Sequence, residues 1–296
     1  MNDTFKKLSF AWWNTSLSPQ AKSRASDDQK QIAIDVIFWL LFEFEIDFLA
    51  LGEISEDDVA MLQNLNELDD YSIESGVSKA GRVRFDTCFI YRADKIQIYQ
   101  PIEIDTGKGD RVMKVAQKVM LQIADDTFMY LFVSHWQSRL YCHENHPDRD
   151  TLGLRLHDAV DEIRMGSEST PYIVLLGDYN DEPFNASLSK QLMATRDKAL
   201  VIKKKNLLYN PFWKHLSYPN PQALDYAGTY YYKSGSITKW HTFDQIIVSS
   251  AFLSGIGWTL NEDLTGIISI PEYLKWVKDS KSTLDHLPIM TTFERN

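Results

Sequence analysis

Short apolar runs of strand length recur along the chain, separated by polar segments. Runs that are rich in β-branched and aromatic residues and bounded by turn residues predict strands. The run from Tyr172 to Leu176 is apolar enough to be buried on both faces, as is typical of a strand inside a sheet. The strands predicted from this pattern comprise residues 8–13, 46–53, 128–136, 172–178, 243–249 and 289–293, with a group of antiparallel strands between residues 71 and 104.

Two other stretches repeat their apolar residues with the period of a helix. Residues 26–40 begin with Ser26 and two aspartates, which suit a helix start, and continue with apolar residues at three- and four-residue spacing. Residues 152–163 show the same spacing and predict an amphipathic helix. Strands and helices alternate without an evident linker, internal repeat or low-complexity tract. We therefore predict one α/β domain over residues 1–296.

Composition and charge narrow the class of protein. The 296 residues are 44% hydrophobic and 24% charged, as in an ordinary globular protein. The net charge of -10 argues against broad, sequence-independent binding to a polyanion, because such binding depends on many Lys and Arg contacts. Any contact with nucleic acid should therefore be local.

The sequence also favours a cytoplasmic protein without a membrane span. It contains only Cys88 and Cys142, and its first ten residues include no uninterrupted apolar run of signal-peptide length. The most apolar stretch, residues 32–51, is interrupted by four acidic residues, which a membrane span rarely tolerates. No feature of the sequence indicates a protein partner.

Six short segments place polar side chains at the edges of apolar runs, where a buried sheet can present residues to a solvent-facing site. Any single polar residue in such a position is more often a cap than a functional group. The segments are Trp13-Asn14, Gly52-Glu53, Ser134-His135-Trp136, Gly177-Asp178-Tyr179-Asn180-Asp181, Phe243-Asp244-Gln245 and Asp285-His286-Leu287-Pro288.

Together and in this order, the six segments resemble the motifs of the endonuclease/exonuclease/phosphatase superfamily, which includes pancreatic-type deoxyribonucleases, abasic-site endonucleases, sphingomyelinases and inositol phosphatases. The match runs from Trp13 to Pro288. The resemblance implies a four-layered α/β sandwich, in which two mixed β-sheets pack face to face with helices outside. It also implies a phosphodiesterase that depends on a divalent metal ion.

The resemblance assigns Glu53 as the principal metal ligand, with Asn14 and Asp285 completing or supporting the cation site. The implied cofactor is Mg²⁺ or Mn²⁺, because hard cations of this kind bind through a few carboxylates and keep several waters.

The resemblance also assigns the catalytic groups. Asp178 aligns or deprotonates the attacking water, and Asn180 steadies that water or a phosphate oxygen. His135 and His286 donate to the scissile phosphate, where negative charge develops. Asp244 holds His286 by its other ring nitrogen, so we expect these two side chains to be hydrogen-bonded, on strands that run parallel as neighbours.

Two positions depart from the motifs. The superfamily usually has serine directly before the last Asp-His pair, where this chain has Leu284. Its second motif more often reads Gln-Glu, whereas here Gly52 precedes Glu53. Each change removes a side chain that could support the site, and neither touches a residue to which the resemblance assigns chemistry.

The first functional hypothesis is a nuclease that hydrolyses DNA, with RNA as the other polynucleotide, by metal-assisted attack of water on the phosphate. The segments around His135 and Asp178 resemble bacterial nuclease-like members, and Arg139 would then clamp a phosphate. The second hypothesis is a small-molecule or lipid phosphoesterase, which the aromatic residues between Tyr209 and Tyr218 keep open. The third is a catalytically silent binding module, against which the retention of every expected acid, amide and histidine counts.

Overall fold

The computed structural model describes residues 6–19, 24–80, 83–109, 111–217 and 225–295 of the chain. Its helices are α1 (Asp27–Phe38), α2 (Glu56–Gln63), α3 (Pro147–Met165), α4 (Lys198–Lys203) and α5 (Pro271–Lys278). Short 3-10 and π-helical turns are η1 (Trp39–Glu43), η2 (Asn66–Leu68), η3 (Ser187–Gln191), η4 (Pro211–Leu216) and η5 (Ser250–Leu253).

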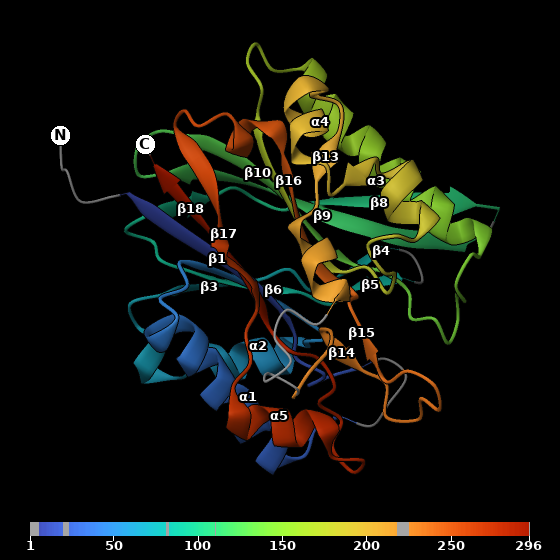
Figure 1. Cartoon of the computed structure of the whole chain (residues 1–296). Coiled ribbons are helices and arrows are strands. Elements are labelled where there is room, and N and C mark those ends of the chain that lie inside the picture. The colour runs from blue at the N-terminus through green and yellow to red at the C-terminus, as the bar shows by residue number, and fades with distance from the viewer. Residues whose placement is uncertain (1–5, 20–23, 81–82, 110, 218–224, 296) are drawn as a thin grey trace.

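Two mixed sheets dominate the described part of the chain (Figure 1). The six-stranded sheet has the order β17 (Trp258–Ile267), β18 (Ile289–Arg295), β1 (Lys7–Asn14), β2 (Phe48–Gly52), β6 (Cys88–Tyr91) and β3 (Ser72–Ser75). The eight-stranded sheet has the order β12 (Ala194–Thr195), β13 (Leu208–Tyr209), β16 (Asp244–Ser249), β11 (Tyr172–Asp178), β10 (Phe128–His135), β9 (Arg111–Ile123) and β7 (Ile96–Ile98), with β8 (Ile102–Lys108) also paired to β9. Two small hairpins pair β4 (Ser78–Ala80) with β5 (Val83–Phe85) and β14 (Tyr230–Tyr231) with β15 (Trp240–His241).

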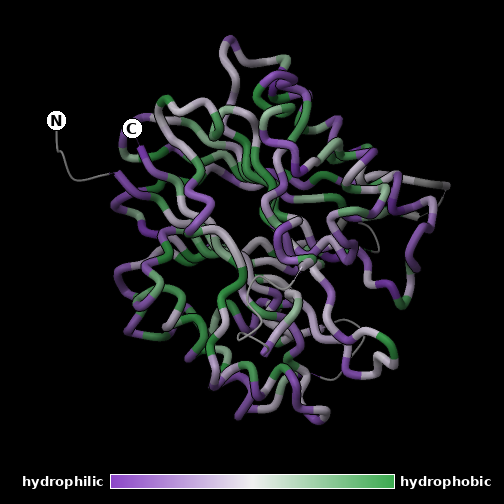
Figure 2. Tube along the Cα trace, viewed as in Figure 1, coloured by the Kyte–Doolittle hydropathy of each residue, from purple (hydrophilic) through white to green (hydrophobic). Residues whose placement is uncertain are grey.

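Alternate residues along a strand face different layers, because successive side chains point to opposite faces of a sheet. Phe10 and Trp12 of β1 lie in the core between the two sheets, whereas Ala11 and Trp13 belong to the core under α1 and α5. Helix α3 covers the outer face of the eight-stranded sheet. The four-layered α/β sandwich is therefore confirmed, and Figure 2 follows the hydrophobic positions along its strands.

Residues near both ends of the chain share the central core. Leu8 and Phe293 both pack between the sheets, on adjacent strands that pair in register. This arrangement supports one domain over residues 1–296, which remains a proposal. None of the helices among the described residues combines the length and apolar character needed to cross a membrane.

Two parallel strand pairs decide which side chains meet at the rim of the sandwich. In the six-stranded sheet, β1 runs parallel to β2, so Asn14 lies beside Gly52 at their carboxyl ends. In the eight-stranded sheet, β10 runs parallel to β11, so His135 lies beside Asp178. The carboxyl ends of all four strands carry segments singled out from the sequence.

The sequence pattern missed β9, β17, α2 and α5. Strand β9 is the longest of these, and its apolar residues are interrupted by Lys114, Gln117 and Lys118. An interrupted run does not read as a strand from one-dimensional periodicity, and pairing with β8 and β10 holds it extended instead.

Candidate active site

A cavity of about 370 Å³ opens where the carboxyl ends of β1 and β2 approach those of β10 and β11. Asn14 and Asp244 are buried and contact the residues that line it, whereas Arg139 is not part of the lining. The residues singled out from the sequence that do line the cavity are Glu53, His135, Asp178, Asn180, Asp285 and His286.

The backbone is unusual at three of the motif positions. Glu53 and Asn180 follow β2 and β11, and both adopt left-handed backbone, with φ of 53° and 50°. Non-glycine residues rarely keep this conformation, and it clusters at functional sites. Gly177 has a φ of 154°, and a Cβ there would lie 1.9 Å from the carbonyl oxygen of Ser134. Glycine therefore lets β10 and β11 approach closely enough to bring His135 beside Asp178.

Asp178 is 1% exposed and accepts hydrogen bonds from two asparagines. Its Oδ1 accepts from the backbone N–H of Asn180 at 2.8 Å. Its Oδ2 accepts from the side-chain amides of Asn14 at 3.3 Å and Asn180 at 3.1 Å. Burial, and after it the nearby Asp244 carboxylate, raise the pKa of Asp178. A carboxylate with a raised pKa is a stronger proton acceptor, as a general base requires.

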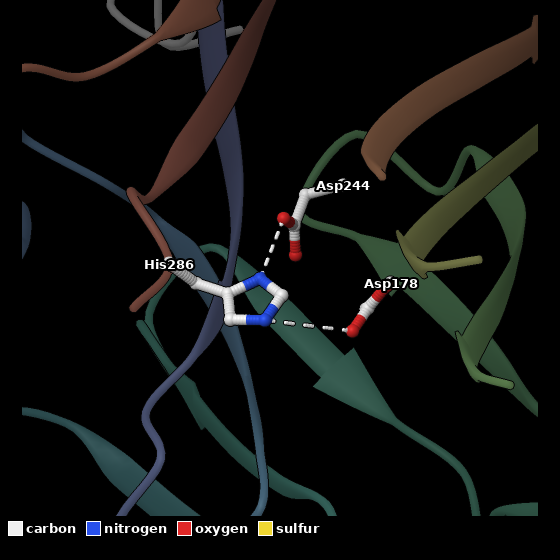
Figure 3. Close-up of side chains that lie close together, drawn as sticks. All are labelled: Asp178, Asp244 and His286. Atoms are coloured by element: carbon white, nitrogen blue, oxygen red, sulfur yellow. Dashed lines mark hydrogen bonds and ion pairs between the residues drawn. The ribbon is translucent and has the colours of Figure 1, made fainter. Parts of the chain in front are cut away.

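His286 lies between two carboxylates (Figure 3). Its Nδ1–H donates to Oδ2 of Asp244 at 2.8 Å, so the predicted hydrogen bond is confirmed. Its Nε2 lies 3.8 Å from Oδ2 of Asp178. Burial alone would lower the pKa of His286, but the Asp244 carboxylate and, to a smaller extent, Asp178 raise it to about 10. The imidazole is therefore a cation at neutral pH.

The predicted strand arrangement for this pair was wrong. Asp244 begins β16 in the eight-stranded sheet, whereas His286 precedes β18 in the six-stranded sheet, so the two strands are not parallel neighbours. The side chains meet because the sheets pack face to face and their strand ends converge at one rim.

A second imidazole is held in the same way by a residue that the sequence interpretation missed. Nδ1 of His135 lies 3.1 Å from both carboxylate oxygens of Asp86, and Nζ of Lys114 lies 2.5 Å from one of them. Burial would lower the pKa of His135, but Asp86 raises it. Burial would raise the pKa of Asp86, but His135 and Lys114 hold it well below its usual range. All three residues of this ion-paired group line the cavity.

Glu53 and Asp285 add two further carboxylates to the lining. Oε1 of Glu53 lies 3.9 Å from Nε2 of His135. Burial raises the pKa of Glu53, and although His135 opposes this, the Asp285 carboxylate adds to it. A carboxylate whose pKa is raised by a second carboxylate is stabilised by a cation between the two, and oxygen donors suit a hard divalent ion. The donor set therefore fits Mg²⁺ or Mn²⁺.

A second group of potential ligands lies nearby. Asp178, Asp244 and His286 each bring one potential ligand atom within 4.8 Å of the others. However, Nδ1 of His286 and Oδ2 of Asp244 are already hydrogen-bonded to each other. This group is better described as a proton-holding network than as the cation site.

The serine that is absent at position 284 has a substitute. The hydroxyl of Ser16 donates to Oδ1 of Asp285 at 2.9 Å, from the loop that follows β1. Leu284 itself is buried in the core under α1 and α5. The departure from the motif therefore does not leave Asp285 without a hydroxyl donor.

Arg139 lies beside the site and is engaged by the protein. Its Nε donates to the carbonyl of Asn180 at 2.9 Å, and its other nitrogens donate to Glu144, Asp181 and Asn185. Its guanidinium also stacks 4.6 Å from the ring centre of Phe243. These contacts suit a residue that holds the loop of Asn180 in place better than one that clamps a substrate phosphate.

Aromatic and apolar side chains form part of the cavity wall. Tyr230 lines the cavity, with its ring centre 4.7 Å from that of His286. Leu140 and Tyr141 also line it and are 70% and 71% exposed. By contrast, Tyr209 and Phe212 are buried between the sheets and Tyr218 lies outside the described residues, so the sequence support for a lipid substrate is weakened.

The two residues that sequence reasoning missed differ in how visible they were. Asp86 precedes the apolar strand Cys88–Tyr91, just as Asp244 begins its own, so the same pattern could have found it. Lys114 lies inside β9 and gives no local signal, because only the packing of the two sheets brings it to Asp86.

Known proteins share this arrangement of layers. Residues 49–289 match the model of the Endonuclease/Exonuclease/phosphatase family. The human Nocturnin catalytic domain with bound sulfate is similar over 98% of this chain and 95% of its own, with 14% identity and a TM-score of 0.61. D. rerio TDP2 complexed with a single-strand DNA product is similar over 97% and 99%, with 17% identity and a TM-score of 0.62.

A third similar structure carries a different activity in its name. The mannosyl-6-phosphatase of Bacteroides thetaiotaomicron is similar over 97% of this chain and 99% of its own, with 14% identity and a TM-score of 0.59. No curated protein matches the sequence. At these identities the solved structures support the fold, and the substrate has to be argued from the cavity.

Proposed function

Because this chain belongs to the endonuclease/exonuclease/phosphatase family, we propose that it is a divalent-metal-dependent phosphodiesterase that hydrolyses DNA or RNA. Hydrolysis of phosphoesters follows from family membership, and the polynucleotide substrate is the proposal. The observation that carries the proposed metal-dependent hydrolysis is a set of groups that meet at one cavity. They are two carboxylates suited to a cation, a buried carboxylate with a raised pKa and two imidazoles, each held by a carboxylate.

Members of the superfamily typically use divalent metals. In this chain Glu53 and Asp285 would hold Mg²⁺ or Mn²⁺, and Asn14 would support the site from behind through its bond to Asp178. When bound, such an ion supplies positive charge beside the scissile phosphate.

The remaining groups fit hydrolysis by water. Asp178 accepts a proton from the attacking water, whose oxygen bonds to phosphorus as the bond to the leaving oxygen breaks. Asn180 holds Asp178 by two hydrogen bonds and so fixes the direction of its free lone pairs. His135 and His286 donate to phosphate oxygens, where negative charge grows in the transition state.

The cavity wall favours a nucleotide with few phosphate contacts. Lys114 is the lysine that lines the cavity among the described residues, and it is ion-paired with Asp86. Exposed Tyr141 offers an aromatic ring on which an unpaired base can stack, and exposed Leu140 adds apolar surface next to it in the chain. TDP2 of D. rerio, which shares the fold, has been seen with a single-strand DNA product. A cytoplasmic location belongs to the same proposal, since the sequence contains only two cysteines, Cys88 and Cys142, and both are buried.

A second candidate is a small-molecule or lipid phosphoesterase. The same exposed Leu140 and Tyr141 would contact an apolar group next to a phosphate, and the acidic net charge of -10 suits a substrate with a single phosphate. A binding module without catalysis is the weakest reading, because the acids, amides and imidazoles are held in the hydrogen-bonded geometry that hydrolysis needs.

One experiment separates these candidates. Purified protein is incubated with single-stranded DNA, duplex DNA, RNA, bis(4-nitrophenyl) phosphate, a phosphomonoester and a phospholipid, each with Mg²⁺, with Mn²⁺ and with EDTA. We expect metal-dependent cleavage of the polynucleotides, with single strands preferred. Turnover of only the phospholipid or the monoester would replace the nuclease proposal by the second candidate, and no turnover with any substrate would favour the binding module.

A further inference from the structure

Trp12 contacts the catalytic network from the core between the two sheets. Its indole is fully buried, and its Nε1–H donates to Oδ1 of Asp244 at 2.8 Å. The other oxygen of Asp244 accepts from Nδ1 of His286, also at 2.8 Å. The two oxygens of Asp244 are therefore divided between an indole on one side and the imidazole on the other, which restricts rotation of the carboxylate.

Gly52 makes room for this indole. Strands β1 and β2 are parallel neighbours, and a Cβ at Gly52 would lie 2.5 Å from Cη2 and 2.8 Å from Cζ2 of Trp12. The indole is rigid and closely packed, so it could not yield without moving its N–H away from Asp244. Gly52 does not adopt the left-handed backbone that favours glycine, so the backbone conformation does not require glycine there. The ring of Trp12 is what excludes a side chain at this position. Glycine thus replaces the glutamine of the Gln-Glu motif at a position where the indole of Trp12, on the adjacent strand, fills the space that a side chain would need.

We propose that Trp12 is a positioning residue: its indole N–H, admitted by Gly52, fixes Asp244 in the orientation that holds His286 for the reaction. The inference rests on the proposed phosphoesterase function and deepens it. It links strands β1 and β2, which carry Asn14 and Glu53 at their ends, to Asp244 on the opposite sheet. Trp12 touches neither the cavity nor the substrate, so it acts through Asp244.

The first test is Trp12→Phe, which keeps an aromatic ring in the core and removes the N–H. A charge-assisted hydrogen bond of this kind corresponds to roughly tenfold to hundredfold in kcat. We expect kcat to fall by that factor while KM changes less than about threefold, because the phosphate contacts themselves remain.

Trp258→Phe is the matched control. Trp258 is also buried between the sheets, and its Nε1–H donates to a carboxylate, Oδ2 of Asp125, at 3.0 Å. Asp125 lies in the turn between β9 and β10, away from the strand ends that form the cavity. This variant should lose thermal stability to a similar degree and keep the wild-type kcat. Equal losses of kcat in both variants would overturn the proposal, since they would reflect core packing.

Gly52→Ala supplies a second, independent variant with Trp12 intact. Its methyl group should displace the indole and lower kcat as Trp12→Phe does. Phenylalanine has no atoms equivalent to the Cη2 and Cζ2 that the methyl would meet, so the double variant should be no slower than Trp12→Phe alone. Additive losses, or an unchanged kcat in Gly52→Ala, would contradict the role assigned to the indole.

A spectroscopic measurement needs no substrate. The proton on Nδ1 of His286 in its bond to Asp244 should give a downfield resonance, which we expect to shift or broaden in Trp12→Phe and Gly52→Ala but not in Trp258→Phe. An unmoved resonance in all three would overturn the proposal. If the wild type hydrolyses none of the phosphoesters tested, the proposed function fails, and the resonance still decides whether Trp12 orients the Asp244–His286 pair.

Discussion

Replacing Asp244 by asparagine keeps the size of the side chain and removes its charge. Asp244 is the largest influence that raises the pKa of His286 to about 10, from about 6.5 for an unperturbed histidine. That difference of about 3.5 pKa units corresponds to about 5 kcal/mol between the two protonation states, at about 1.4 kcal/mol per unit. His286 is 5% exposed, so solvent screens little of this interaction. Without that charge, only Asp178 and Asp285 are left to offset burial, so we expect the pKa of His286 to fall and less of the imidazole to be protonated at pH 7.

We expect Asp244→Asn to lower kcat by about 10²- to 10³-fold, the usual cost of losing one preorganised donor to a developing charge. KM should change only a few-fold, because the help is needed mainly in the transition state. The assay is steady-state hydrolysis of a phosphodiester at saturating Mg²⁺ and pH 7.

Asp47→Asn is the control for loss of a buried carboxylate. Asp47 is 4% exposed, accepts from the backbone of Ser9 and pairs with Lys95, but lies at the opposite end of β2 from Glu53. This variant should lose stability and keep its kcat. An Asp244→Asn enzyme with wild-type kcat, or one whose whole defect is a raised KM, would refute the reasoning.

The other predictions concern pH, the second imidazole and Arg139. The pKa of His286 is raised in the folded state, so the stability that its protonated form contributes is fully present below about pH 6.5 and is lost as pH rises through about 10. The unfolding free energy of Asp244→Asn, measured by urea titration, should therefore differ less from that of the wild type as pH rises over this window. Asp86→Asn should lower kcat by about tenfold or more, because Asp86 holds His135. The pKa of Asp86 is depressed in the folded state, so the wild type has extra stability above about pH 4 and loses it on further acidification. The Asp86→Asn variant should lack this extra stability. Arg139→Ala should lower thermal stability and turnover by loosening the Asn180 loop, yet leave the salt dependence of nucleic-acid binding unchanged; a smaller salt slope would restore Arg139 as a phosphate clamp.

Much of the site could be predicted because its residues follow apolar strands and occur along the chain in the same order as the motifs of the family. Glu53 and Asp178 stand at strand ends, and sequence alone places such residues at a rim. The orientation of Arg139 could not be predicted, since closeness to His135 in sequence does not fix the direction of the loop between them. Lys114 and Trp12 could not be predicted either, because each reaches the site across the space between the two sheets.

Metal dependence measured together with metal binding tests the central claim most directly. Hydrolysis of a phosphodiester and Mn²⁺ binding by electron paramagnetic resonance are followed in the wild type and in Glu53→Gln, over a metal titration that starts from EDTA-treated protein. For the wild type, we predict no hydrolysis in EDTA and recovery when metal is added. For Glu53→Gln, we predict a preserved fold, a loss of Mn²⁺ affinity and a turnover at low metal that is lower by at least roughly a hundredfold. Hydrolysis that survives EDTA, or a Glu53→Gln protein with wild-type binding and turnover at low metal, would contradict the account.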